Sequence, residues 1–119
     1  MATISLLVTD IRTFGDHGHI IGWGTLGNGD SGTPLQMIGS ADRSVQVEGT
    51  FGAGGTVLIE GSNDGIIYRL LRDPSGTALS ITSAGIAAIL EISAFIRPRV
   101  SAGDVSTAID VTLLVRRPS

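Results

Sequence analysis

The chain has 119 residues, of which 42% are hydrophobic and 16% are charged, so a single domain with an ordinary hydrophobic core is expected and intrinsic disorder is excluded. Its 17 glycines favour many turns between short strands over a helical bundle. It has no cysteine, which excludes disulfides, thiolate metal sites and cysteine nucleophiles, and its net charge of −3 provides no basic surface for nucleic acid.

The first 43 residues are rich in glycine and contain only short hydrophobic clusters after the first strand signal. They predict an edge strand at residues 4–11, a second strand at 34–38 and long loops between them. The start of the chain lacks the pattern of a signal peptide, and no apolar run reaches the roughly 18–20 residues of a membrane-spanning helix. We therefore expect a soluble protein, made in a cytoplasm, whose residues 1–43 form an N-terminal strand and a glycine-rich arm.

Residues 44–119 show denser and more regular strand patterns. Residues 44–48 and 56–60 alternate apolar and polar side chains around a glycine-rich turn, which predicts a hairpin. Pro98 lacks a backbone donor and places its strand at an edge or a bulge. The spacing of Ile86, Ile89 and Leu90 is compatible with one or two helical turns. Further strands are predicted at 66–71, 77–82, 94–100 and 107–117.

Strands that recur about every ten residues, with turns between them, predict an all-β fold. We expect a single antiparallel β-sandwich, jelly-roll-like, formed by residues 44–119. Period-two alternation places one set of side chains on the core face. This predicted core consists of Val45, Val47, Val57, Ile59, Leu79, Ile81, Ile109, Val111, Leu113 and Val115.

Two segments invite a metal interpretation, and each has a simpler alternative. Residues 63–65, Asn-Asp-Gly, with Glu60 nearby resemble part of a calcium loop, but a hairpin turn explains the same residues with fewer ligands missing. His17 and His19, beside Asp16 and with Asp30 as a third ligand, could share an ion, whereas a solvated polar loop needs no further ligand. We predict no metal.

The sequence offers little material for catalysis or for a cofactor. None of the candidate nucleophiles Ser5, Ser62 and Ser75 lies in a G-x-S-x-G nucleophile elbow. The glycine-rich residues 22–30 lack the lysine of a phosphate loop, and no helix signal follows them for a dinucleotide fingerprint. The three glutamates, Glu48, Glu60 and Glu91, fall on different elements. We therefore predict neither an enzyme nor a bound cofactor.

Three side chains are candidates for contact with another chain. Trp23 lies in the glycine-rich arm and either anchors it on a partner or caps its own core. Arg97 and Arg99 share one strand face, opposite Ile96, Pro98 and Val100. This face is either a solvated surface or one that pairs with acidic groups of another subunit.

Several motifs between residues 45 and 117 resemble small virion structural proteins of tailed bacteriophages. They are the segments 47–52, 57–65, 71–79, 96–98 and 111–117. The nearest functional class is the capsid decoration, or cement, protein. The motifs are turns and strands, so the resemblance carries over no catalytic or binding residue.

This resemblance implies a protein on the capsid exterior that bridges neighbouring capsomers, after synthesis in the host bacterial cytoplasm. Its expected partners are the major capsid protein and further copies of itself, a trimer being favoured over a dimer, with no nucleic acid and no membrane. If residues 1–43 carry the attachment, deletion of the first 30 should leave a folded domain that binds heads poorly. Two alternatives remain: an adhesion module that binds host-surface glycan through Trp23 and Tyr68, and a head–tail or tail component.

Overall fold

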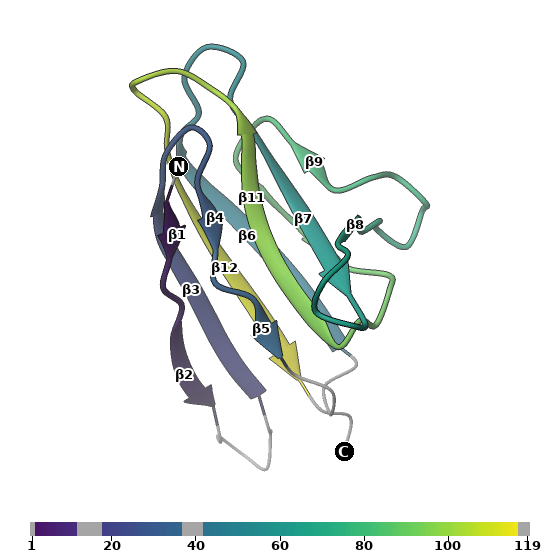
Figure 1. The fold of residues 1–119 in the computed structure, drawn as a ribbon. Coiled ribbons are helices and arrows are strands. Elements are labelled where there is room, and N and C mark those ends of the chain that lie inside the picture. The colour runs from purple at the N-terminus through teal and green to yellow at the C-terminus, as the bar shows by residue number, and fades with distance from the viewer. Residues whose placement is uncertain (1, 12–17, 37–41, 117–119) are drawn as a thin grey trace.

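The computed structural model describes residues 2–11, 18–36 and 42–116. Throughout that part of the chain the protein is all-β, and two sheets pack face to face in a body that measures 43 × 27 × 26 Å (Figure 1). The predicted all-β, antiparallel sandwich is confirmed. Within the described ranges there is no helix of the length and apolar character needed to span a membrane.

The seven-stranded sheet lies in front in Figure 1. Its strands follow the order β1-β4-β11-β7-β8, with β5 also beside β11 and β9 also beside β7. All of its pairings are antiparallel except β1 with β4. The strands are β1 (Thr3–Ile4), β4 (Ser31–Gly32), β5 (Leu35–Gln36), β7 (Thr56–Ser62), β8 (Arg69–Leu70), β9 (Ser80–Ile81) and β11 (Phe95–Ala102).

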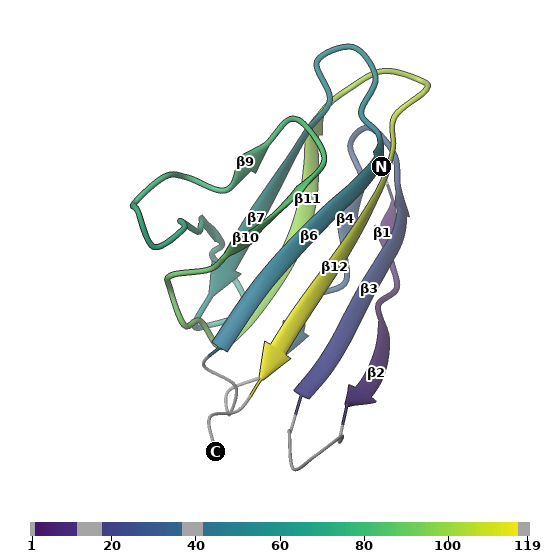
Figure 2. The same cartoon turned by 180° about the vertical axis from the view of Figure 1, so that it is seen from behind.

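The five-stranded sheet lies in front in Figure 2 and is antiparallel throughout. Its strand order is β10-β6-β12-β3-β2. Consequently β12 lies at the centre, between β6 and β3, whereas β10 and β2 form the two edges. The strands are β2 (Leu7–Ile11), β3 (Gly18–Leu26), β6 (Asp42–Thr50), β10 (Gly85–Ala88) and β12 (Ala108–Arg116).

The core between the sheets contains the residues that period-two alternation predicts. Nine of the ten are buried, and Ile81 is partly buried and packs against them. Alternation is reliable here because one face of each strand contacts the opposite sheet. The core also contains residues outside the predicted set: Ile21, Trp23, Leu26, Leu35, Leu71, Ile89, Ile96 and Val100.

Residues 18–26 belong to the sandwich and not to an arm, which corrects the expectation for this part of residues 1–43. They form β3, which pairs with β12 on one side and β2 on the other. The predicted strand at 4–11 is also divided: β1 joins the seven-stranded sheet and β2 the five-stranded sheet. The start of the chain therefore contributes to both layers.

The predicted hairpin between residues 44–48 and 56–60 is wrong. Both segments are strands, but β6 lies in the five-stranded sheet and β7 in the seven-stranded sheet. The link crosses between the layers with positive φ angles at Gly52 and Gly54, and the Thr107 hydroxyl donates to the Phe51 carbonyl to hold it (2.8 Å). Alternation shows which face of a strand is buried but does not identify its neighbour.

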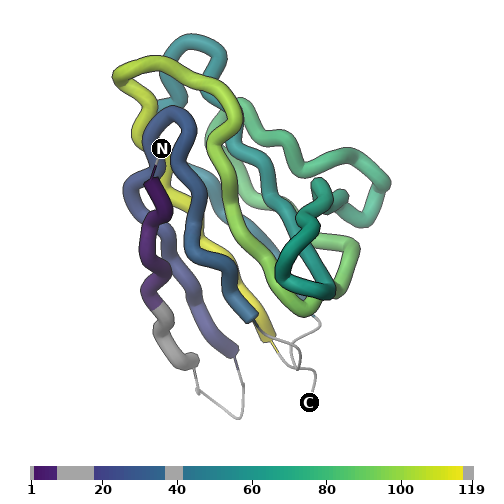
Figure 3. The backbone as a smooth tube through the Cα atoms, in the orientation of Figure 1, coloured from purple at the N-terminus to yellow at the C-terminus, as the bar shows by residue number. Residues whose placement is uncertain are grey.

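The predicted helical turn at residues 86–90 is also wrong, because residues 85–88 form β10. Ile86 points outward and Ile89 is buried. The predicted strands at 66–71 and 77–82 are reduced to the two-residue strands β8 and β9, within the long excursion at the right of Figure 3. Leu71, Leu79 and Ile89 of this region are buried in the core.

Pro98 lies within β11, which is not an edge strand. Pro98 lies opposite Ile59 of β7. Its nitrogen, which carries no hydrogen to donate, points to the other side of β11, away from β7. The Val100 amide, two residues on, donates to the Asp30 carbonyl (2.8 Å), so the nitrogen of Pro98 points to the same side. There the neighbouring strand is interrupted between β4 and β5. Proline is thus accommodated where no ladder bond is required.

Candidate interaction surface

Trp23 is part of the core, so of its two predicted roles the structure supports the cap over its own core. Its side chain is 2% exposed, and its indole nitrogen donates to the Thr33 carbonyl (2.9 Å). A Cβ atom at Gly32 would lie 2.5 Å from Trp23 Cδ1 and 2.7 Å from Pro98 Cδ. Glycine is required there because the indole lies against the backbone of β4. Trp23 presents no open ring to a partner or a glycan.

Arg97 and Arg99 share one face of β11, as predicted, and both bind the same carboxylate. Glu60 of β7, buried at 6% exposure, accepts from Arg97 Nε (3.2 Å) and from Arg99 Nη2 (3.0 Å). These hydrogen bonds to Glu60 raise the pKa of Arg99. The guanidinium of Arg97 also covers one face of the Tyr68 ring, 3.9 Å from its centroid. The cluster ties β7 to β11, and a role for either arginine in a subunit interface stays a prediction.

Two of the residues proposed as metal ligands, Asp30 and His19, lie in the described part of the chain. Asp30 accepts from the backbone amides of Ala2 and Gly27 (both 2.9 Å) and so fixes the approach to β4. His19 lies on β3, while Asp16 and His17 fall outside the described residues. Among the residues described, no group of three or more His, Asp or Glu side chains is placed to hold a metal.

The segment 63–65 is a turn built around Asp64. Its carboxylate accepts from the amides of Ile66 (2.8 Å) and Ile67 (3.0 Å) and from the Ser62 hydroxyl (2.8 Å), and Gly65 has a φ of 75°. These bonds favour the ionised form and lower the pKa of Asp64 to about 2. The predicted turn is confirmed. Ser62, one of the serines considered as a nucleophile, supports this turn.

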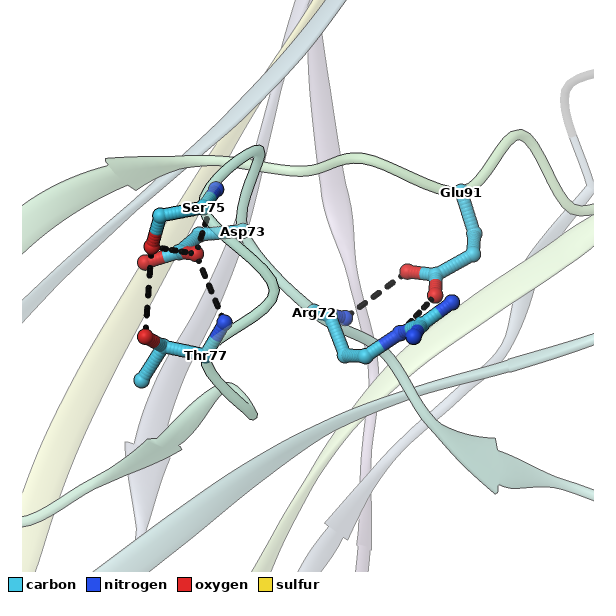
Figure 4. Close-up of polar contacts among 5 residues, drawn as sticks. All are labelled: Arg72, Asp73, Ser75, Thr77 and Glu91. Carbon is cyan, nitrogen blue, oxygen red and sulfur yellow. Dashed lines mark hydrogen bonds and ion pairs between the residues drawn. The ribbon is translucent and has the colours of Figure 1, made fainter.

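Figure 4 shows how two carboxylates fix the excursion between β8 and β9. Asp73 accepts from the Ser75 hydroxyl (2.7 Å) and the Thr77 amide (2.9 Å), and these bonds lower the pKa of Asp73. Glu91 accepts from the Arg72 amide (2.8 Å) and pairs with its Nε (2.6 Å), which lowers the pKa of Glu91. Ser75 and Glu91 therefore hold local backbone. Glu48 lies on β6 in the other sheet, so the three glutamates are separate, as predicted.

The outer face of the five-stranded sheet carries a patch without charged side chains. The register aligns two rows of side chains across the strands. One row runs from Ile86 on β10 to Leu7 on β2, and the next contains Leu114 and Ile20. We call this surface the outer patch. It consists of Leu7, Ile20, Gly22, Ser44, Gln46, Ile86, Ala88, Thr112 and Leu114.

Charged groups bound the outer patch at both ends. At one end Arg116 pairs with Asp42 (2.9 Å). At the other end Glu48 and Asp110 lie directly opposite each other on β6 and β12. Like charges at opposite positions destabilise a sheet unless a cation is near. The patch is therefore uncharged in its middle and acidic at one end.

The outer patch is hollowed and exposes large apolar side chains. A hollow of about 260 Å³ is lined by Ile20, Ser44, Gln46, Ile86, Thr112 and Leu114. Ile86 is 71% exposed and Leu7 72%. Two other hollows lie among turns, one beside Arg69 and Glu91 and one beside Asn28 and Val105. Polar Ser44, Gln46 and Thr112 lie between these apolar side chains, so the patch is a mixed apolar and uncharged polar surface, as many protein contact surfaces are.

The outer patch was not among the predicted interface residues, although part of its signal is present in the sequence. Ile86 and Leu114 interrupt or oppose the alternation of their segments, which marks apolar side chains on an outward face. Ile20 gave no usable signal because β3 itself was not predicted, whereas Leu7 lies on β2, within the strand predicted at residues 4–11 but not assigned to this sheet. Comparisons of the chain with protein-family models, with curated proteins and with solved structures returned no match.

Proposed function

We propose that this protein is a structural virion protein that binds the outside of a bacteriophage capsid and stabilises it by bridging neighbouring capsomers. The motifs between residues 45 and 117 that resemble small phage virion proteins support this class. The outer patch carries the proposal, because it is an exposed, uncharged surface on a sheet of paired strands, and binding through it requires no chemistry. Its acidic end, at Glu48 and Asp110, suits a basic region on the major capsid protein.

The proposal locates the attachment on the sheet face and not on an N-terminal arm. Residues 18–26 are committed to the sandwich as β3, and Trp23 is buried. A face made by five paired strands needs no ordering on contact, so it binds without the entropy cost of folding an arm. Homo-oligomers would multiply such weak single contacts on a capsid through effective concentration.

The test is binding to heads that lack the protein, measured by co-sedimentation. Leu114→Glu places a charge in the outer patch, on an exposed position of the central strand, and should reduce binding strongly while the melting temperature stays near that of the wild type. Ile66→Glu is the matched control. Ile66, like Leu114, is an exposed aliphatic side chain, but it lies in the turn after β7 and outside the outer patch. It should bind like the wild type.

Decorated heads should also resist higher temperature or pressure than bare heads, with a fixed copy number of the protein per capsid. Equal binding by Leu114→Glu and the wild type would remove the outer patch as the contact. No binding of wild-type protein to heads, together with a positive glycan array, would favour the adhesion alternative.

A further inference from the structure

The edge strand β10 has one side that no described segment pairs. It is the last strand of the five-stranded sheet and is hydrogen-bonded to β6 alone. It contains only glycine, isoleucine and alanine, and residues 74–90 around it include no charged residue. Edge strands normally carry a charge, a proline or a bulge that prevents pairing with another chain. β10 itself has none of these devices, and its open side ends at Leu90, whose amide donates to the Arg72 carbonyl (2.8 Å).

The register shows which backbone groups of β10 point outward. The Ile89 amide donates to the Arg43 carbonyl (3.0 Å), towards β6. Because the direction of the backbone groups alternates along a strand, those of Ala87 and Gly85 also point to β6. The N–H and C=O groups of Ile86 and Ala88 therefore point to the unpaired side. These two residues offer two donors and two acceptors along one short edge.

We propose that β10 pairs with β10 of a second copy of this chain, in antiparallel register about a two-fold axis beside Ala87. Ile86 then lies opposite Ala88 of the partner subunit, and Ala88 lies opposite Ile86 of the partner subunit. Each such pair exchanges both of its backbone hydrogen bonds. The five-stranded sheets of the two copies become one continuous sheet.

A second copy fits this edge because the pattern is self-complementary. Ile86 and Ala88, one on each side of Ala87, both direct their backbone N–H and C=O groups to the unpaired side. A two-fold rotation beside Ala87 therefore brings donors opposite acceptors, as an isologous contact requires. On the outer face a large Ile86 side chain meets a small Ala88 across the axis, and no charges are brought together. At the axis the two Ala87 side chains are small enough to lie side by side.

The inference deepens the proposed function, because it gives the homo-oligomer a surface and joins two outer patches into one. It rests on the proposed function only for that purpose, since the pairing itself concerns the isolated protein. The contact requires no capsid, so the two proposals are tested separately.

The first test is the mass of the full chain in solution, by sedimentation equilibrium and light scattering. The wild type should have twice the 12.2 kDa of one chain. Ala88→Pro removes only a donor that points away from β6, so it should leave the fold intact and raise the dimer dissociation constant by roughly tenfold or more. Ile86→Lys adds an edge charge and should do the same. Ile66→Lys, at an exposed site outside the strands, is the control and should stay dimeric.

The second test uses the absence of cysteine from the chain. Ala87→Cys places two thiols at a non-hydrogen-bonded pair across the axis, where the side chains are closest, so mild oxidation should yield a covalent dimer. Ala53→Cys, in the exposed link between the sheets, should not.

A monomeric wild type, a mass of three chains, or variants at Ile86 and Ala88 that dimerise like the wild type would overturn the pairing. Leu114→Glu should dimerise normally whatever its binding to heads. If the wild type dimerises but does not bind heads, the proposed function has failed and the pairing stands. If the wild type binds heads but is monomeric, the pairing has failed and the proposed function stands.

Discussion

The carboxylate of Asp64 is the residue whose ionisation the structure perturbs most clearly. Its pKa of about 2 lies below the usual 3.8 because three donors bind the ionised form. A lowered folded-state pKa means that ionisation stabilises the fold above about pH 4, and that this stabilisation is lost as the pH falls towards 2. A carbon-13 NMR titration of the Asp64 carboxyl should give a midpoint near 2.

The variant Asp64→Asn checks the same linkage by thermal unfolding. Its melting temperature should fall less between about pH 4 and pH 2 than that of the wild type, because it lacks the group that gains a proton there. A titration midpoint near 3.8 would mean that the turn does not hold its carboxylate in solution as described.

Between elements, the most specific contact is the one that Glu60 makes from β7 to two arginines of β11. Glu60→Gln keeps the size of the side chain but removes its negative charge and replaces one of its two acceptor oxygens by an amide donor, so Arg97 and Arg99 lose the ion pair and part of their hydrogen bonding. We expect a loss of roughly 1–3 kcal/mol in the free energy of unfolding, measured by urea denaturation. Glu48→Gln is the control, because Glu48 is exposed on the outer face of the other sheet, and it should change stability by less than about 0.5 kcal/mol.

A Glu60→Gln variant as stable as the wild type would show that the arginines do not depend on this carboxylate. Arg97 and Arg99 would then be available to another subunit, as the interface hypothesis for them requires.

Strands β12 and β3 show why some elements could be predicted and others could not. In β12 every second residue from Ile109 to Val115 is buried, which gives an uninterrupted period of two. In β3 the buried hydrophobic residues are Ile21, Trp23 and then Leu26, because the register with β12 shifts between the pairs at Trp23 and Leu26. This shift, together with five polar or glycine positions among the nine residues of the strand, hides the period. The bulge follows from pairing with β12, and a single segment does not contain that information.

At the scale of the whole molecule, the same strand changes the expected result of truncation. Deletion of residues 2–30 removes β1, β2 and β3, and with them Ile21, Trp23 and Leu26 from the core. The remaining chain should show no cooperative thermal transition, in contrast to the folded domain expected from the sequence alone. Deletion of residues 2–4 removes only β1, a two-residue strand, and should leave a cooperative transition as the control.

A cooperative transition of the longer truncation near the wild-type temperature would mean that the sandwich closes without β3. Residues 1–43 would then again be candidates for an arm that attaches the protein to the capsid. The core residues of β6, β7 and β12 were predictable because burial on one face determines alternation. Which strands pair with one another was not predictable, because the sheet to which each strand belongs depends on where β3 and β11 lie.

The central position of β12 affects the order in which the protein can form during translation. Both neighbours of β12, the strands β6 and β3, precede it in the chain, and they do not pair with each other. Until residue 116 has left the ribosome, the five-stranded sheet exists only as the separate pairs β2–β3 and β6–β10. During this interval the uncharged segment 74–90 has emerged while its sheet is incomplete. If β10 pairs between copies as proposed, nascent chains on one messenger expose adjacent copies of this edge before either has folded, and faster translation should then increase misassembly of the chain.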